Sequence, residues 1–361
     1  MNPTGKRGNF TFDDLKIWQR HIVGAKFATI GGDIGPNPVE VGPLLIASVH
    51  SPALIAAMDR ETGDMRWRRD LAGLCRSSVA AANGSLIVNT EGALLSLSQD
   101  VGEIIWMRET DVAGEAWLYA PSVEGGDQLF LGDNAGRLSC IDTRTGELLW
   151  AQKLAGGANQ AVNARPLLFS NLVLVGDVTG TVVAYRVDSG AEEWRKDLGE
   201  APVAQALLFG QLLVIRSLSG IYWLRTEDGA IESWRAWSDS QPWTIVCSED
   251  ALFVVTMARN PEPPPFGTVA HMLTSFRGGE AEYSVPIAGF VNALQWQKET
   301  GLLYASTLQG LAIIDPTTGN TLHRVSAEDR VDRSSCDPIT LAHENIYVLT
   351  MHGDVWALRH P

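Results

Sequence analysis

A glycine followed four positions later by a ring-bearing residue recurs along this chain about every 40 residues. The pairs are Gly63 and Trp67, Gly102 and Trp106, Gly146 and Trp150, Gly190 and Trp194, Gly279 and Tyr283, and Gly319 and His323, while Gly229 and Trp234 are one position further apart. A period near 40 residues that carries turn glycines is typical of small β-sheets repeated around an axis. The repeat therefore predicts a β-propeller, a fold that hosts many unrelated functions.

Residues 119–154 show one repeat unit most clearly. Strand-forming runs at 119–123, 128–132, 137–142 and 147–153 are separated by turn residues at 124–127, 133–136 and 143–146. Gly146 ends the last turn, where a residue with positive φ completes a tight hairpin. A proline is expected to open the first strand of a unit, because a missing N–H is tolerated there. The prolines concerned are Pro43, Pro121, Pro166, Pro202 and Pro338.

Counting these units predicts a single all-β domain over 1–361, an eight-bladed β-propeller of four-stranded antiparallel blades. Seven blades are expected near 44–71, 77–110, 119–154, 164–198, 201–236, 243–285 and 290–325. Residues 335–358 supply three strands of an eighth blade, and residues 14–22 repeat the fourth-strand pattern with Trp18 and Ile22. The N-terminal strand is therefore expected to close the last blade and remove the open edge. An amphipathic helix over 10–22 is the alternative.

The run Ala57-Met-Asp59-Arg-Glu-Thr62-Gly63-Asp-Met-Arg-Trp67 resembles the tryptophan-docking repeat of pyrroloquinoline-quinone-type propellers. The resemblance covers essentially the whole chain and implies that each tryptophan packs between neighbouring blades. Within that family, the chain is similar to the scaffold-type propeller lipoprotein of outer-membrane barrel assembly, which does not catalyse a reaction. The tryptophans that the resemblance makes structural are Trp18, Trp67, Trp106, Trp150, Trp194 and Trp234.

Enzymes of the same family oxidise alcohols or sugars with the quinone and Ca²⁺. Their alcohol-oxidising branch stacks two adjacent cysteines on the quinone, whereas the four cysteines of this chain are far apart. An aldose-type branch lacks that pair, so the missing pair does not decide the question. Asn163, Asn292 and Asp337 are expected at the starts of innermost strands, where they could bind a hard cation or simply cap loops. We expect no catalytic residue, no metal site and no cofactor, with the quinone and calcium only under an oxidoreductase alternative.

Charge and composition narrow the partners and the location. The formal net charge of −14 argues against nucleic acid, which basic patches bind, and against anionic lipid. The sequence shows no secretory signal and no apolar run of 18 residues, so no membrane insertion is expected. The separated cysteines are expected to be reduced thiols. We therefore predict a cytoplasmic protein whose propeller is itself monomeric.

The predicted partner site lies on the propeller face that carries the blade-to-blade connections and the turns between second and third strands. Arg and aromatic residues, which are enriched in protein interfaces, gather there together with a proline-rich insertion at 260–266. Such an insertion is stiff and extended and suits a partner groove, although a passive surface loop is an equal alternative. The Arg side chains could instead cover apolar strand ends and pair with nearby acids. The candidate residues are Arg76, Trp117, Arg165, Trp243, Pro263, Pro264, Pro265, Phe266, Phe290 and Arg333.

These observations favour a non-catalytic scaffold that binds protein partners within a larger cytoplasmic assembly. Two alternatives remain open. One is a quinone- or metal-dependent oxidoreductase, and the other is a sensor that binds a small ligand or glycan in the central funnel.

Overall fold

The described part of the chain is almost entirely β-structure, arranged as eight sheets in chain order. The computed structural model describes residues 8–23, 38–49, 52–73, 75, 79–90, 92–109, 123–133, 135–154, 161–162, 164–199, 203–258, 271–307, 310–326, 339–342, 344–349 and 353–360. Seven sheets have four strands and one has five. This is the all-β, eight-bladed propeller that the repeat predicts, and the blades are numbered here in chain order, with the blade that ends at Arg359 as the eighth.

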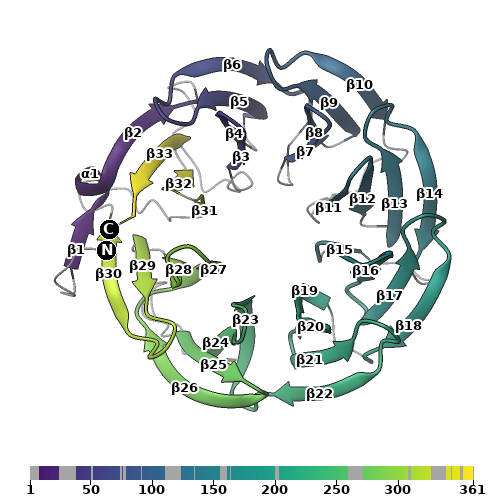
Figure 1. Ribbon diagram of the computed structural model, residues 1–361, viewed down its shortest axis with the longest axis vertical. Coiled ribbons are helices and arrows are strands. Elements are labelled where there is room, and N and C mark those ends of the chain that lie inside the picture. The colour runs from purple at the N-terminus through teal and green to yellow at the C-terminus, as the bar shows by residue number, and fades with distance from the viewer. Residues whose placement is uncertain are drawn as a thin grey trace. The chain divides into compact units, whose positions relative to one another are not determined.

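The chain forms two compact units, and unit 2 comprises residues 53–57 and 66–236. Its complete blades are the second to the fifth, and Figure 1 shows their fourth strands β10, β14, β18 and β22 along the periphery of that unit. The strands of these blades are β7 Ala80–Ala82, β8 Ser85–Thr90, β9 Ala93–Ser98 and β10 Ile104–Glu109; β11 Val123–Gly125, β12 Gln128–Gly132, β13 Arg137–Asp142 and β14 Leu148–Lys153; β15 Leu167–Phe169, β16 Leu172–Gly176, β17 Thr181–Arg186 and β18 Glu192–Asp197; and β19 Val203–Phe209, β20 Leu212–Ser217, β21 Gly220–Arg225 and β22 Ile231–Ala236.

Unit 1 comprises residues 1–52, 58–65 and 237–361. It holds the sixth, seventh and eighth blades, while the first blade contributes strands to both units. The strands of the first blade are β3 Val39–Val41, β4 Leu44–Val49, β5 Leu54–Asp59 and β6 Met65–Asp70. Those of the later blades are β23 Ser240–Cys247, β24 Leu252–Ala258, β25 His271–Arg277 and β26 Glu280–Ile287; β27 Val291–Gln297, β28 Leu302–Thr307, β29 Gly310–Ile314 and β30 Thr321–Ser326; and β31 Ile339–Leu341, β32 Asn345–Leu349 and β33 Asp354–Arg359.

The N-terminal strand closes the eighth blade, as predicted. Strand β2 (Lys16–His21) pairs antiparallel with β33, with Trp18 opposite Ala357. The alternative of a helix over 10–22 is wrong, because the only helical turn in the described residues is α1 (Phe12–Leu15). Thr11 caps this turn, and its backbone N–H donates to the Asp14 carboxylate at 2.7 Å. That bond holds the pKa of Asp14 below its usual value.

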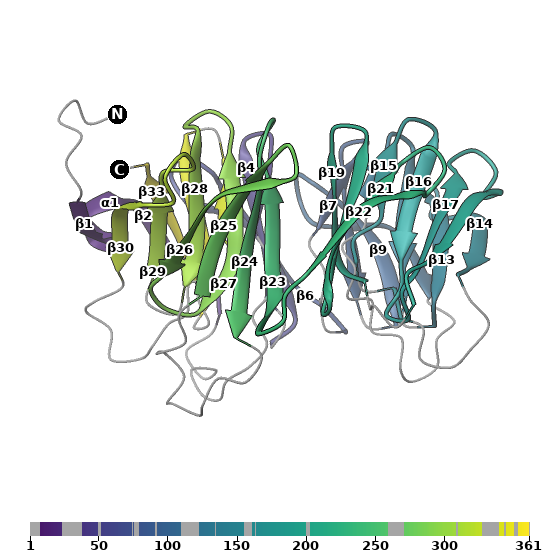
Figure 2. The same cartoon turned by 90° about the horizontal axis from the view of Figure 1, so that it is seen from below.

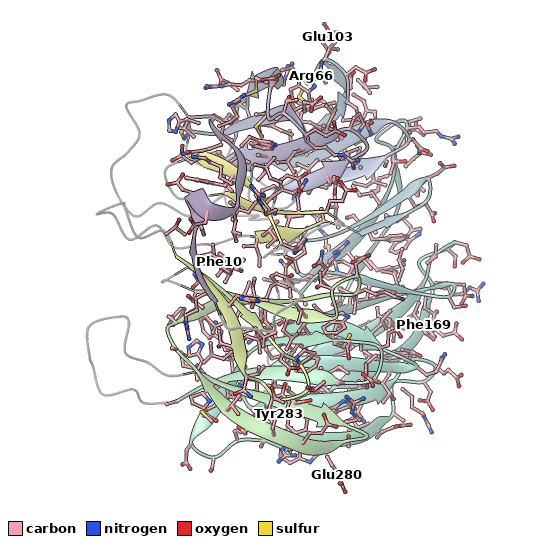
Figure 3. All side chains as sticks on the ribbon, turned by 60° about the vertical axis from the view of Figure 1, so that its left-hand side comes forward. Phe10, Arg66, Glu103, Phe169, Glu280 and Tyr283 are labelled. Atoms are coloured by element: carbon pink, nitrogen blue, oxygen red, sulfur yellow. The ribbon has the colours of Figure 1, made fainter. Side chains whose placement is uncertain are left out.

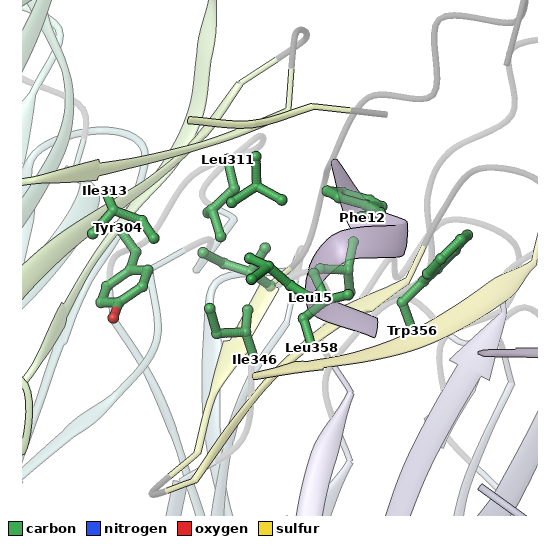
Figure 4. Packing of buried hydrophobic residues seen from close by; sticks show 11 residues of the cluster. Phe12, Leu15, Tyr304, Leu311, Ile313, Ile346, Trp356 and Leu358 are labelled. Carbon is green, nitrogen blue, oxygen red and sulfur yellow. The ribbon is translucent and has the colours of Figure 1, made fainter. Parts of the chain in front are cut away.

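One strand was not predicted. Strand β1 (Gly8–Thr11) pairs in parallel with β30 and gives the seventh blade a fifth strand. Figure 2 shows β1, α1 and β2 following one another beside β30 and β33. Phe12 and Leu15 of α1 are buried against Tyr304 and Leu311 of the seventh blade and Trp356 of the eighth (Figure 4). The N-terminal segment therefore joins the seventh blade to the eighth.

The core lies between neighbouring blades rather than within any one of them. One cluster joins Val255 and Leu273 of the sixth blade to Leu294 and Ala305 of the seventh. Others join the fourth blade to the fifth and the second to the third in the same way. Burying a Leu or Val side chain contributes about 1.5–3 kcal/mol, so each blade depends on its neighbours for stability.

Five of the seven repeat glycines receive the tryptophan of the preceding blade. Gly146 has φ +74°, and a Cβ added there would lie 2.6 Å from the Trp106 ring. The same holds for Trp18 at Gly63, Trp67 at Gly102, Trp150 at Gly190 and Trp194 at Gly229. Each indole Nε1 also donates to the carbonyl three residues before that glycine, over 2.7 to 3.1 Å; the acceptors are those of Arg60, Gln99, Thr143, Val187 and Thr226. Glycine is needed here both for its positive φ and for the space that the indole occupies.

The later blades vary this arrangement. Tyr283 packs on Gly319 and its hydroxyl donates to the Pro316 carbonyl at 2.8 Å. His323 instead meets the added strand, since its ring lies 5.5 Å from that of Phe10, which is labelled in Figure 3. Trp234 differs from the expected docking, because its side chain is 60% exposed and stacks on Tyr222 of its own blade.

The predicted strand starts need correction in two blades. Pro43 does not open a first strand, because it lies in the turn between β3 and β4. In the third blade the described first strand begins at Val123 and includes Glu124 and Gly125, which were expected in a turn. Pro166 directly precedes β15, as predicted. Pro121, Pro202 and Pro338 lie outside the described residues, and the prediction of a single domain stays a prediction.

No helix in the described part of the chain is long and apolar enough to cross a membrane.

Candidate functional site

Three of the ten predicted partner-binding residues fall within the described residues. Arg165 belongs to unit 2, where its exposed side chain directly precedes Pro166 and β15. Trp243 and Phe290 belong to unit 1 and are in contact, with ring centroids 5.3 Å apart in an edge-to-face arrangement. The seven that lie outside the described residues are Arg76, Trp117, Pro263, Pro264, Pro265, Phe266 and Arg333.

Trp243 is directed to its place by a β-bulge. The pairing of β23 with β24 shifts register between Pro242 and Thr244, so Trp243 is the extra residue. A bulge locally bends a strand and re-aims one side chain. The Trp243 indole Nε1 donates to the Val291 carbonyl at 2.7 Å, across to the seventh blade.

A third ring, which the sequence did not single out, completes the cluster. His271 is fully buried, with its ring 6.2 Å from Trp243 and 4.9 Å from Phe290. Its Nδ1 accepts a hydrogen bond from the Val291 N–H at 3.2 Å. The ring is therefore neutral, with its proton on Nε2, and burial lowers the pKa of His271 to about 4. We call Trp243, His271 and Phe290 the aromatic cluster.

His271 accepts a hydrogen bond that a turn carbonyl accepts in two other blades. In the third and fourth blades, a tight turn after the second strand presents the Asp133 and Asp177 carbonyls, which accept the N–H of Val162 and Val203. Val291 occupies the place of Val203 in its own blade, since both begin a first strand just before a bulge. In the sixth blade residues 259–270 lie between β24 and β25 in the sequence, and the His271 imidazole is the acceptor for the Val291 N–H of the next blade.

The aromatic cluster can bind but offers no catalytic apparatus. The His271 Nε2–H is a buried donor without a hydrogen-bond partner in the structure. A neutral imidazole with so low a pKa is a poor general base at neutral pH. The described residues place no nucleophile in hydrogen-bond contact with it. The geometry supports a role in joining blades and in shaping the surface beside the insertion.

The described residues also provide no metal centre. No group of three or more His, Cys, Asp or Glu side chains among them could hold a metal ion. Asn292 is the bulge residue of β27, and its Nδ2 is buried without a hydrogen-bond partner. Asn163 and Asp337 lie outside the described residues. The prediction of no cofactor therefore stays a prediction.

Comparison with known proteins decides the family. A family model described as outer membrane protein assembly factor BamB matches residues 13–242, more than half of the chain. The chain belongs to this family. BamB of Yersinia pestis is 26% identical over 160 residues, which make up 41% of this chain and 40% of that protein. The match thus spans about two fifths of the length of this curated relative.

Solved structures confirm the fold of the BamB-family chain. BamB from Moraxella catarrhalis matches with a TM-score of 0.70 at 16% identity, over 96% of this chain and 97% of that one. Quinohemoprotein alcohol dehydrogenase from Comamonas testosteroni gives a TM-score of 0.72 at 12% identity, over 95% and 76%. One of these proteins is an assembly factor and the other an enzyme, so at such identities the likeness shows the fold alone.

The predicted cytoplasmic location is wrong. The matching family and the curated relatives carry the name of an outer membrane protein assembly factor. The expectation of a cytoplasmic assembly is overturned with it. That expectation rested on an N-terminal sequence without a recognisable signal, and such a sequence says nothing about the partners of the folded protein.

Proposed function

We propose that this chain is a non-catalytic scaffold that holds a protein partner within an outer membrane protein assembly complex. Membership of the BamB family carries the proposal. The described tryptophans support it, because Trp18, Trp67, Trp106, Trp150 and Trp194 are committed to blade-to-blade packing. The absence of a catalytic constellation in the described residues leaves binding as the role that the site supports.

Partner-binding residues are proposed in each unit separately: the aromatic cluster and the insertion at 260–266 in unit 1, and Arg165 in unit 2. Trp and Arg are the residues that most often dominate binding energy in protein interfaces. A proline-rich segment that ends in Phe266 would lose little conformational freedom on binding. The remaining proposed residues are Arg76, Trp117 and Arg333.

The proposal is tested by capture from the native host. The tagged chain is expressed there, crosslinked, and isolated from the solubilised envelope fraction for quantitative mass spectrometry. We expect a protein of the outer-membrane assembly machinery at near-stoichiometric amounts. Recovery of no envelope protein above the untagged control would refute the proposed function.

Variants then locate the interface. Residues 260–266 are replaced by a short Gly-Ser turn in one variant, and Arg165→Ala is made in another. Arg144→Ala is the matched control, because this exposed arginine of unit 2 pairs locally with Asp127. We expect the first two variants to lose partner and the control to keep it. Full retention by all three would place the interface elsewhere while leaving the scaffold role intact.

A further inference from the structure

The fourth strands of the second and third blades, together with the turn before β10, expose a set of apolar side chains. Six of them, all in unit 2, are 42% to 59% exposed. We call these the rim patch: Val101, Ile104, Ile105, Met107, Leu148 and Leu149. Exposed apolar residues scattered singly are ordinary, but a group on adjacent strands marks an interaction surface.

Comparison of the eight blades shows what distinguishes these strands. The two residues before the docking position include a charged side chain in five blades, such as Arg66 in the first and Glu192 and Glu193 in the fourth. The others are Glu232, Glu282 and Lys16. Charged residues on an exposed strand protect its edge from pairing with another chain. Only the second, third and seventh blades lack a charged residue at these two positions.

In the seventh blade, the edge of the fourth strand pairs with an added strand. Its fourth strand, β30, has Thr321 and Leu322 at these positions and is covered by the chain's own β1. The added strand runs parallel and begins opposite the docking residue, with Gly8 paired to His323 and Phe10 to Val325. By position, His323 corresponds to Trp106, so an added strand on β10 would lie along residues 106–109.

Charge indicates the chemistry of the occupant. Glu103 and Glu109 lie at the two ends of β10, and Glu147 precedes Leu148. All three are exposed, and Figure 3 shows Glu103 projecting from the surface. No ion pair involving these carboxylates occurs in the described part of the chain, whereas Arg108 donates to the Gly146 carbonyl. The edge is thus apolar with unneutralised acidic flanks.

We propose that the edge strand β10, together with β14, binds an extended apolar segment of a protein partner that carries Lys or Arg at its flanks. The segment adds to β10 as a parallel fifth strand, as β1 adds to β30. Main-chain hydrogen bonds supply the pairing, and the rim patch and the glutamates select the side chains. This deepens the proposed scaffold function, on which it rests, by naming a second surface and the kind of segment that it binds.

The test uses the full chain and three fluorescent peptides. One has alternating valine and threonine around a central phenylalanine with two lysines at each end. The second has glutamates in place of the lysines, and the third has prolines in place of the valines. Binding is followed by fluorescence anisotropy, and hydrogen exchange reports the protection of residues 104–109. We expect saturable binding of the lysine peptide, at least tenfold weaker binding of the other two, and new protection in β10.

Variants assign the binding to this edge. Ile105→Lys and Met107→Lys each introduce a charge into β10. Each is expected to weaken the binding of the lysine peptide at least tenfold. Ile231→Lys is the matched control, because it changes an exposed residue of the fourth strand β22 of the fifth blade. Equal affinity of all variants, or equal binding of all peptides, would overturn the proposal.

Two further readouts separate this proposal from self-association and from the proposed scaffold function. Self-association in sedimentation velocity that Ile105→Lys abolishes would show a second copy as the occupant and would also overturn it. Ile105→Lys is also carried through the capture from the native host. Partner recovery with failed peptide binding would refute the edge-strand proposal and leave the scaffold function standing.

Discussion

Replacing Gly146 by Ala separates the two reasons for a glycine at each docking position. The new side chain adopts a backbone with φ +74°, which costs about 1–2 kcal/mol for a residue with a Cβ. It also places that Cβ 2.6 Å from the Trp106 ring, and such overpacking costs about 1–3 kcal/mol. We therefore expect Gly146→Ala to lower the free energy of unfolding by about 2–5 kcal/mol. Urea denaturation followed by circular dichroism measures the change.

Gly84 provides the matched control in the same unit. Its φ is +75°, but a Cβ added there has nothing within 4 Å. Gly84→Ala should therefore cost only the backbone part, about 1–2 kcal/mol. In a Trp106→Ala background, which itself costs about 3–5 kcal/mol, Gly146→Ala should fall to the same value as Gly84→Ala. Equal costs for the two alanines in the wild-type background would refute the docking argument.

Three other changes test different parts of the structure. Deleting residues 1–22 removes β1, α1 and β2 and opens the edge of β33, so we expect a loss of several kcal/mol; an unchanged melting curve would contradict this. Burial lowers the pKa of His271 to about 4 in the folded protein. As pH falls below 6.5, this imidazole is therefore protonated in the unfolded chain before it is protonated in the folded one. The free energy of unfolding should then drop by about 3 kcal/mol between pH 6.5 and pH 4. In urea denaturation, His271→Gln should lack this part of the pH dependence; the same pH dependence in variant and wild type would count against the argument. Pyrroloquinoline quinone and Ca²⁺ should give neither saturable binding nor dye-linked oxidation of alcohols or sugars, and turnover would favour the oxidoreductase alternative.

The repeat pattern predicted the sheets because it reports local turn chemistry. Asp142 shows why: its carboxylate accepts the N–H groups of Arg144 and Thr145, and its carbonyl accepts the N–H of Gly146. These contacts are all within one hairpin and leave a signature in the sequence. The partner of each tryptophan is not local in this way, since Trp106 packs on the glycine of the next blade rather than on its own.

The features that the sequence did not predict depend on distant contacts. Strand β1 has only four residues, and nothing in Gly8–Thr11 distinguishes a strand that pairs with β30 from an N-terminal tail. The role of His271 depends on the position of Val291 in the next blade. Of the candidate site, the sequence identified Trp243 and Phe290 from their expected place at a blade end, and the structure brings them into contact.

The N-terminal segment also determines the order in which this chain can finish folding. Residues 8–21 precede all the other strands of the propeller, yet their partners β30 and β33 lie in its last two blades. Contacts so far apart in sequence form slowly, because the loop entropy is lost before the contacts are gained. Until then Phe12 and Leu15 have no core to enter, and β33 keeps an open edge. Closure of the eighth blade is therefore a late step, and any factor that holds residues 8–21 delays it.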